Sequence, residues 1–392
     1  MSTLQDGVTK AWHDRQSHPG SVQHAALPHF AHPTLPTLLE PFTAEPSRPM
    51  SSPTPFKAAT LHDVARVAGV SLITASRALG NPSLVSEKTI ARVQQAVRET
   101  GYIPNLLAGG LKSRRSKTVA ALVPAISVQQ FLPTVEALTE ALAAQGYQLI
   151  LGQSGYDYAR EEDLLNTLIA RQPDGIVVTG LVHSPKARER LGQLRIPVVE
   201  TWDLSERPVD MVVGFSHTKV GAAIAGFFLT QGWSRVGIAT GNDHRAALRR
   251  DGFVAAMGRD VPTAMVPAPS SLALGRRALA ELLAQDPTLQ AVYCSSDAMA
   301  HGVIVEAQAR GLRVPEDLAV CGFGDADFAQ HMHPSLTTVH IDGARIGQLA
   351  AQMITQRCRG EATEQPIVDV GFWIAEREST GGPGHTDRQM PE

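Results

Sequence analysis

From Thr118 onward, short β-rich runs alternate with longer stretches of helical periodicity, and this alternation constrains the fold more than any other feature. The clearest runs are TVAALVP, YQLILG, DGIVVTG, IPVVE, RVGIAT, AVYCSS and LAVCGF. Regular alternation of strands and helices produces parallel sheets with helices on both faces. The alternating part exceeds what one hydrophobic core usually covers, and its pattern restarts near Val212. The sequence therefore predicts an α/β body over residues 118–379 with two doubly wound lobes and a ligand cleft between them.

The composition is that of an ordinary globular protein. The 392 residues are 43% hydrophobic and 19% charged, which is enough chain for two or three domains. No apolar run reaches the roughly 18 residues that span a bilayer, and the amino terminus lacks the features of a secretory signal. The three cysteines, Cys294, Cys321 and Cys358, are far apart, which indicates buried thiols rather than a disulfide framework. We therefore expect a cytoplasmic protein without a membrane partner, metal site or cofactor.

Both ends of the chain lack the pattern of a packed domain. Residues 1–56 hold nine prolines and five histidines without apolar periodicity, so we expect a disordered leader. The histidines have no regular spacing, and we expect no metal site among them. Met50 opens a stretch that is a natural start of translation, which leaves open whether residues 1–49 belong to the protein. Residues 380–392, TGGPGHTDRQMPE, are predicted to form a disordered tail.

The stretch TLHDVARVAGVSLITASRALGN, residues 60–81, predicts two short helices joined by a tight turn. Thr60 and Asp63 have the spacing of a capping box at the start of the first helix. Gly69 supplies the turn, and Ser71 caps the second helix. Such a compact pair of helices raises the question of what the second helix presents to its surroundings.

The second helix leaves one face free for a partner. Val70, Ala75 and Leu79 form its core side, and a longer helix from Ser86 to Gly101 completes a small helical domain over residues 57–104. The side chains that point outward are Ser71, Leu72, Ile73, Thr74, Ser76 and Arg77. Arginine can pair with guanine, apolar side chains can contact thymine methyl groups, and serines can bond phosphates. This face is typical of a helix-turn-helix whose second helix enters the major groove of DNA.

The distribution of charge supports the same interpretation. Between Lys57 and Lys117, ten lysines and arginines stand against three acids, whereas the whole chain has a net charge of −3. The segment therefore carries +7 and the remainder of the chain −10. A basic head on an acidic body favours binding of a polyanion at one end only.

The same residues carry a family resemblance. TLHDVARVAGVSLITASRALGN and the later GYIPNLLAGGLKS resemble the head of the lac-repressor (LacI/GalR) family of transcription regulators. SSDAMAHGV, GLRVPEDLAVCGF and PSLTTV follow in the family's order, so the resemblance extends from Thr60 to about Ser379. GYDYAREEDLL, DGIVVTGLVHSP and IPVVETWD are most similar to the gluconate-operon repressor branch. The resemblance implies a helix-turn-helix head and a hinge, followed by two lobes like those of periplasmic binding proteins.

The resemblance also implies which residues contact DNA. Residues 105–117 correspond to the hinge helix, which begins at Asn105, and its linker. Leu111 matches a leucine that wedges into the minor groove at the centre of the operator, with Lys112 beside it. The complete implied set of DNA-binding residues is Ser71, Leu72, Ile73, Thr74, Ser76, Arg77, Asn105, Leu111 and Lys112.

For the effector, the resemblance implies gluconate or a related sugar acid bound between the lobes. Arg249 matches the effector-binding arginine of the family, and Asp297 matches an aspartate that bonds sugar hydroxyls or else caps its own helix. Gln130 and Phe131 match the loop after the first strand, and Trp202 either stacks on the ligand or only packs. The expected effector-binding residues are Ser127, Gln130, Phe131, Trp202, Arg249, Ser271 and Asp297.

The resulting hypothesis is a repressor that leaves a palindromic operator when it binds the effector. A homodimer is expected because one head reads a half-site too short for specificity. A sugar-responsive activator stays open, since the direction of control depends on where the operator lies. A sugar-binding protein without a DNA role would lack the basic head. An enzyme is disfavoured because no nucleophile elbow, phosphate-binding loop or metal-ligand set occurs in the sequence.

The hinge sequence yields a test of its own. Gly109 and Gly110 replace better helix formers, and each glycine costs about 1 kcal/mol in a helix. Replacing both with alanine is expected to raise operator affinity and weaken the response to the effector, because the hinge helix is then preformed. Operator binding measured with and without effector reports both effects. A double variant that binds and releases DNA like the parent would contradict this role.

Overall fold

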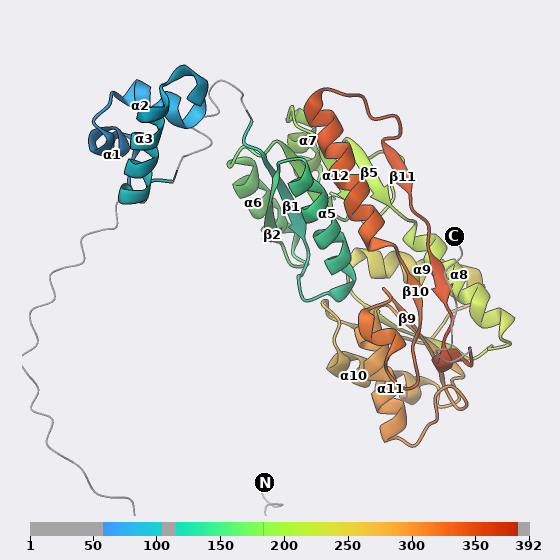
Figure 1. The fold of residues 1–392 in the computed structure, drawn as a ribbon. Coiled ribbons are helices and arrows are strands. Elements are labelled where there is room, and N and C mark those ends of the chain that lie inside the picture. Colours follow the sequence, from blue (N-terminus) through green and yellow to red (C-terminus); the bar gives the residue numbers. More distant parts are fainter. Residues whose placement is uncertain (1–57, 104–114, 183, 383–392) are drawn as a thin grey trace, which may run out of the picture. The chain divides into compact units, whose positions relative to one another are not determined.

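The computed structural model describes residues 58–103, 115–182 and 184–382. They form a helical head up to residue 103 and a two-lobed α/β body from residue 115, which confirms the predicted fold class (Figure 1). Several predicted features lie outside the described residues. These are the leader 1–56, hinge residues Asn105, Gly109, Gly110, Leu111 and Lys112, and residues 383–392 of the tail.

The head consists of α1 (Leu61–Ala68), α2 (Leu72–Gly80), the 3₁₀ turn Pro82–Leu84 and α3 (Glu87–Thr100). The predicted capping box is present, since the Thr60 N–H donates to the Asp63 carboxylate at 2.9 Å. Gly69 has a φ of 62°, a conformation that glycine adopts without strain, and it turns the chain from α1 into α2. Ser71 accepts a hydrogen bond from the Thr74 N–H at 3.1 Å and so caps α2.

A small apolar core joins the three helices of the head. Its buried members are Val64, Ala68, Ala78, Val93 and Ala96. Ala75 is also fully buried, as predicted. Val70 and Leu79 pack against this core but stay partly exposed, and Ala78, which the sequence prediction did not include, is buried. The small side chains of Ala75 and Ala78 hold the inner side of α2, and its outer side stays exposed.

Lobe 1 contains a parallel six-stranded sheet in the order β11-β5-β4-β3-β1-β2. Its strands are β1 (Thr118–Val123), β2 (Gln148–Gln153), β3 (Gly175–Thr179), β4 (Val198–Thr201), β5 (Met211–Gly214) and β11 (Ile367–Asp369). Its helices are α5 (Leu132–Ala144), α6 (Tyr158–Ile169), α7 (Pro185–Gln193) and α12 (Gly343–Arg359). Along β1, Val119 and Ala121 face α5 and α12, whereas Ala120 and Leu122 face α6 and α7. Both faces are covered, which explains the continuous apolar run in this strand.

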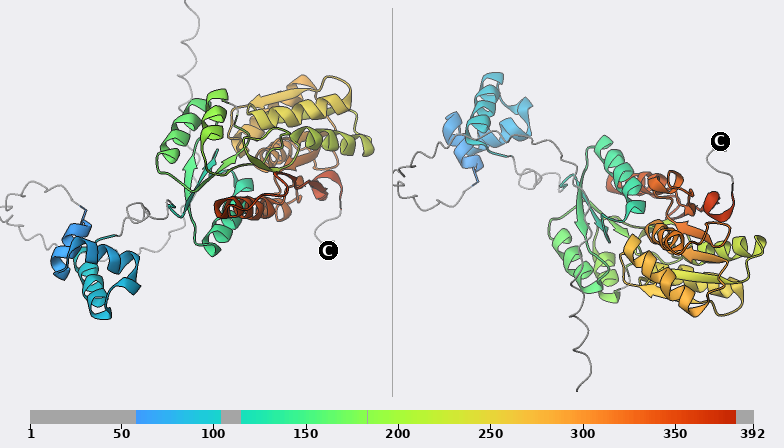
Figure 2. Two further views of the ribbon diagram at one scale, coloured as in Figure 1. Left: turned by 90° about the horizontal axis from the view of Figure 1, so that it is seen from above. Right: turned by 90° about the horizontal axis from the view of Figure 1, so that it is seen from below.

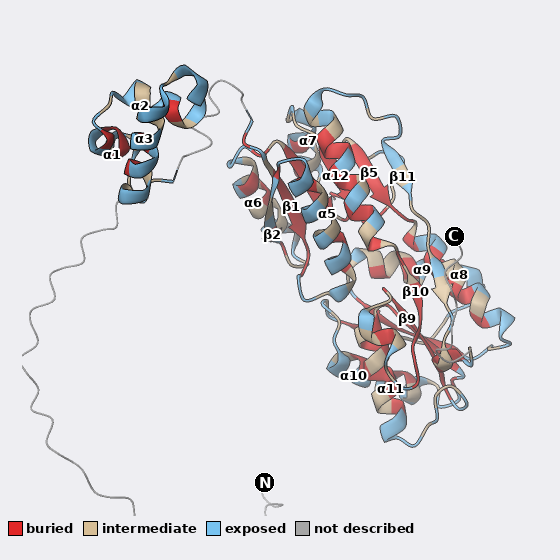
Figure 3. Ribbon diagram, viewed as in Figure 1, coloured by how far each residue is buried: buried red, intermediate tan, exposed pale blue. Residues whose placement is uncertain are grey.

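Lobe 2 repeats this arrangement with a sheet in the order β12-β10-β9-β8-β6-β7, in which only β12 runs antiparallel to its neighbour. Its strands are β6 (Val236–Gly241), β7 (Thr263–Val266), β8 (Ala291–Cys294), β9 (Ala319–Phe323), β10 (Thr337–His340) and β12 (Trp373–Ala375). Its helices are α8 (His217–Thr230) and α9 (His244–Met257) on one face, and α10 (Leu272–Gln285) and α11 (Asp297–Ala309) on the other. Figure 2 shows the body from two further directions, and Figure 3 shows its buried strands between partly exposed helices.

Three connections carry the chain between the lobes, from β5 to α8, from β10 to α12 and from β11 to β12. One hydrophobic core continues across these connections. Trp202 of lobe 1 packs edge-on against Phe215 with 5.9 Å between ring centroids, and Phe215 lies 6.2 Å from Phe323 of lobe 2. The two lobes therefore share a packed aromatic cluster where the chain passes from one to the other.

The structure also corrects the sequence prediction. All seven predicted runs are strands, but β5, β7, β10, β11 and β12 were missed because three or four residues carry too little periodicity. The packed part of the chain extends beyond Ser379, where the tail was predicted to begin. Thr380 is buried and its hydroxyl lies 2.6 Å from the hydroxyl of Thr337. None of the described helices is long and apolar enough to cross a membrane.

Helices α8 and α9 approach so closely that the contact requires glycine. A Cβ on Gly221 of α8 would overlap the carbonyl oxygen of Arg249 in α9, whereas Gly226 of α8 is exposed with open space around its Cβ position. Gly221→Ala is expected to lower the free energy of unfolding by about 1–3 kcal/mol through overpacking. Gly226→Ala should raise it by about 1 kcal/mol through helix propensity. Urea unfolding measures both, and two variants of equal stability would contradict the close contact.

Candidate functional site

The outward face of α2 carries the side chains that were predicted to read DNA. Leu72, Ile73, Ser76 and Arg77 are exposed, and Thr74 is half-buried. Ile73 is 64% exposed, so its apolar atoms are available for contact with a partner. Among the described residues, the Arg77 side chain has no hydrogen-bond or ion-pair partner. The face therefore offers an unengaged guanidinium next to apolar atoms.

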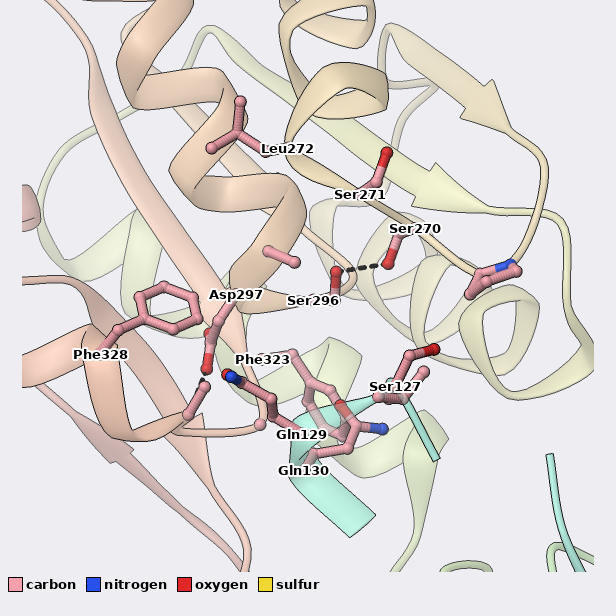
Figure 4. Close-up of a pocket in the computed structure, with 15 residues that line it drawn as sticks. Ser127, Gln129, Gln130, Ser270, Ser271, Leu272, Ser296, Asp297, Phe323 and Phe328 are labelled. Carbon is pink, nitrogen blue, oxygen red and sulfur yellow. Dashed lines mark hydrogen bonds between the residues drawn. The ribbon is translucent and has the colours of Figure 1, made fainter. Parts of the chain in front are cut away.

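A cavity of about 450 Å³ lies between the lobes, where both sheets present the carboxyl ends of their strands. Lobe 1 contributes the loop after β1, and lobe 2 contributes residues that follow β7, β8 and β9. Of the predicted effector residues, Ser127, Gln130, Ser271 and Asp297 line this cavity. Figure 4 shows the lobe 1 residues Ser127 and Gln130 opposite Asp297 of lobe 2. The structure thus brings four of the seven predicted residues together.

Asp297 both lines the cavity and supports its wall. Its carboxylate accepts hydrogen bonds from the Thr338 hydroxyl at 2.6 Å and from the Ala326 N–H at 2.7 Å. Burial raises the pKa of Asp297 to about 6. Ser296 caps α11 instead of Asp297, since the Ser296 hydroxyl accepts a bond from the Met299 N–H at 3.3 Å. Each carboxylate oxygen of Asp297 has further acceptor capacity for a ligand hydroxyl.

Arg249 does not line the cavity. It is 4% exposed, and its guanidinium carbon lies 3.9 Å from the ring centroid of Phe323, a residue of the cavity wall. Its N–H groups donate to the Tyr293 hydroxyl at 3.1 Å, to His217 Nδ1 at 2.9 Å and to the Ser295 carbonyl at 3.1 Å. None of the ion pairs in the described chain involves this arginine. The structure therefore does not place Arg249 in the cavity wall, and its contact with an effector, which the family resemblance implied, stays a prediction.

Phe131 and Trp202 do not line the cavity either. Both are almost completely buried, and their rings pack edge-to-face with 5.0 Å between centroids. The indole N–H of Trp202 donates to the Thr134 hydroxyl at 2.9 Å. In this arrangement Trp202 packs against its neighbours. The contacts of Phe131 and Trp202 with a ligand stay predictions, since neither side chain lines the cavity.

A second, smaller cavity of about 170 Å³ lies where β2 and β3 end and α9 begins. Arg245 lines it, one helical turn before Arg249, and its Nη1 is buried without a hydrogen-bond partner. The Arg245 guanidinium carbon lies 5.3 Å from the Phe131 ring centroid. Glu161 and Tyr156 line the same cavity, and burial raises the pKa of both. This cavity combines a cation with weakly acidic groups.

Sequence reasoning missed several residues of the larger cavity wall. These are Gln129, Ser270, Leu272, Ser296, Phe323 and Phe328. Ser296 and Phe323 stand at the carboxyl ends of β8 and β9, so the rule that selected Asp297 would have found them if applied to every predicted strand. Ser270 and Leu272 follow β7, which was not predicted, and the same rule had no strand to act on there.

Comparison with known proteins identifies both parts of the chain. The bacterial regulatory proteins of the lacI family match residues 60–105, and the periplasmic binding protein-like domain matches residues 225–380. The HTH-type transcriptional regulator GntR of Pseudomonas aeruginosa is 37% identical over 82% of this chain and 95% of its own length.

Two solved structures share the fold and the sequence. A LacI family transcriptional regulator from Silicibacter pomeroyi is 32% identical with a TM-score of 0.77, covering 82% of this chain and 99% of its own. The transcription regulator GntR from Chromobacterium violaceum is 36% identical with a TM-score of 0.65, covering 68% of this chain and 100% of its own. The names of these relatives confirm the prediction of a regulator rather than an enzyme. By these similarities the chain belongs to the LacI family of bacterial regulatory proteins, and its head is the DNA-binding part of a transcriptional regulator.

Proposed function

We propose that the chain works as a cytoplasmic homodimer that represses transcription from a palindromic operator and is released from it by a sugar acid. Family membership supports the operator and the dimer. The motifs shared with the gluconate-operon repressor branch, and the similarity to regulators named GntR, support gluconate or a close relative as the effector. Repression is preferred over activation because several relatives of this chain are named transcriptional repressors.

One observation carries the proposal of an acidic effector. Arg245 and Arg249 stand one helical turn apart on α9, and neither guanidinium has a carboxylate within 4 Å in the described part of the chain. Arg249 is buried among neutral acceptors, and Arg245 has a buried N–H without any acceptor. Buried cations are costly unless an anion accompanies them. A carboxylate bound close to α9 would supply that anion through charge-assisted hydrogen bonds.

The hydroxyl groups of a sugar acid find their partners in the larger cavity. Asp297 accepts hydrogen bonds, while Ser127, Gln130 and Ser271 offer both donors and acceptors. These groups come from both lobes, so a ligand that contacts all of them favours one arrangement of the lobes. The resulting shift in operator affinity is limited by the difference in effector affinity between the two arrangements.

Calorimetry tests the acidic effector. We expect gluconate, 6-phosphogluconate or 2-ketogluconate to bind the wild-type protein at least tenfold more tightly than neutral glucose, because only the acids neutralise the α9 arginines. Arg249→Gln should lower the affinity for the acid at least tenfold and leave operator binding intact. Arg250→Gln is the matched control, since Arg250 already pairs with Asp251 at 2.6 Å.

Two outcomes would contradict the proposal of a sugar acid. Glucose or another neutral sugar as the tightest ligand would refute the role of the two arginines. A nucleobase as the tightest ligand would refute the gluconate branch as well. An Arg250→Gln variant that loses as much affinity as Arg249→Gln would show only a general effect of charge.

The DNA-binding face of α2 has its own test. Arg77→Ala is expected to remove about 1–3 kcal/mol of discrimination between the operator and a scrambled duplex, because a bidentate contact with guanine is lost. Stability should not change, since the side chain packs against nothing. Arg98→Ala removes the same charge from α3 and serves as control, because Arg98 bonds only Gln95. Competition binding at fixed salt measures both, and undiminished operator preference in the Arg77 variant would refute the assignment.

A further inference from the structure

A continuous chain of hydrogen bonds runs from Arg249 of lobe 2 into lobe 1. Arg249 Nη1 bonds His217 Nδ1 at 2.9 Å, and His217 Nε2 bonds the Trp202 carbonyl at 2.9 Å. The Trp202 indole N–H donates to the Thr134 hydroxyl at 2.9 Å, which donates to the Gly343 carbonyl at 2.8 Å. The side chains that form these hydrogen bonds are all buried.

This series of hydrogen bonds reaches two of the three connections between the lobes. His217 is the first residue of α8, directly after the connection from β5. Gly343 is the first residue of α12, directly after the connection from β10, and a Cβ there would lie 3.2 Å from the Trp202 ring. Trp202 itself has a φ of 62°, a left-handed conformation that a bulky side chain keeps only when its surroundings hold it.

The partners of His217 fix its protonation. Arginine can only donate, so Nδ1 of His217 is the acceptor and carries no proton. The carbonyl of Trp202 can only accept, so Nε2 carries the proton and donates it. The imidazole is therefore neutral, with both nitrogens satisfied at once. Its two bonds join Arg249 on α9 to the end of β4.

We propose that His217 is a positioning residue that ties the Arg249 guanidinium to the connections between the lobes. The proposal rests on the proposed function, in which an acidic effector reaches the α9 arginines. An anion that draws Nη1 of Arg249 away leaves His217 Nδ1 without its donor in a buried site, which is costly unless the surrounding groups rearrange. The rearrangement passes to Trp202, Thr134 and Gly343, and thereby to α12 and the arrangement of lobe 1.

Two substitutions separate the bonds of His217. His217→Asn keeps an acceptor at the position of Nδ1 but loses the donor to Trp202. We expect gluconate affinity within threefold of wild type, while the ratio of operator affinity without and with saturating gluconate falls at least tenfold. His217→Gln keeps a donor at the position of Nε2 but loses the acceptor for Arg249. Its gluconate affinity should fall at least tenfold, and that ratio should fall as well, because Arg249 no longer reaches Trp202 through residue 217.

Thr134→Val extends the test to the lobe 1 end of the hydrogen-bond series. It removes the bonds to Trp202 and Gly343 without touching Arg249 or His217, so it should behave like His217→Asn. Identical behaviour of the Asn and Gln variants, or unchanged release in both His217→Asn and Thr134→Val, would overturn the proposal. Thermal unfolding of each variant shows whether it is folded.

A measurement without ligand separates this proposal from the proposed function. Failure of every sugar acid to bind the wild-type protein would refute the proposed function alone. Amide hydrogen exchange, measured on the protein without ligand, then tests the positioning role of His217. Arg249→Gln should speed exchange in the first turn of α12, residues 343–347, at least threefold relative to Arg250→Gln. Equal exchange in the two variants, or an NMR spectrum showing the proton of His217 on Nδ1, would overturn the proposal whether or not the variants of His217 fold.

Discussion

The buried guanidinium of Arg249 is the interaction on which the arrangement of lobe 2 at the cleft depends. Its three hydrogen-bond partners, His217, Tyr293 and Ser295, belong to α8, to β8 and to the residue after β8. Arg249 is 4% exposed and depends on these bonds, because an unsatisfied buried charge costs far more than a single hydrogen bond contributes. One side chain thus fixes a helix, a strand and a loop relative to one another. The same side chain stacks on Phe323, so the wall of the larger cavity rests on it.

The connection between the lobes is packed rather than loose. Phe131, Trp202 and Phe215 of the first lobe and its connection meet Phe323 of the second in one core. Close-packed interiors do not deform gradually, so a change in the angle between the lobes requires these rings to adopt another discrete packing. This favours a regulator with two distinct arrangements over one with a continuous range. Whichever arrangement contacts the effector on both sides of the cavity is the one that the effector populates.

What the sequence could predict follows from how local each signal is. Thr60, Asp63, Gly69 and Ser71 act on neighbours within four residues, and the structure forms the head from them as expected. The alternation of strands and helices can likewise be recognised from short stretches of sequence. Arg249 was expected at the ligand because its position matches a family motif, and Trp202 was expected either to stack on the ligand or to pack. The surroundings of both side chains are set by residues far away in the sequence. Thr134 contacts Trp202 and His217 contacts Arg249 only after the sheets have assembled, and no local sequence pattern predicts these contacts.

In the function proposed above, the chain binds two different anions, DNA and a sugar acid, and its charges can be compared with that requirement. The head segment carries +7 and the remainder −10, so the body as a whole repels anions at long range. Salt at physiological strength screens exposed charges beyond about 8 Å, and the cleft therefore depends on cations close at hand. Arg245 stands in the first turn of α9, where the positive end of the helix dipole disfavours a basic side chain. A bound carboxylate would relieve that repulsion and the desolvation of Arg249 together.

Because DNA binding involves many exposed phosphates and the cleft involves two partly or fully buried guanidinium groups, rising salt weakens the first interaction more than the second.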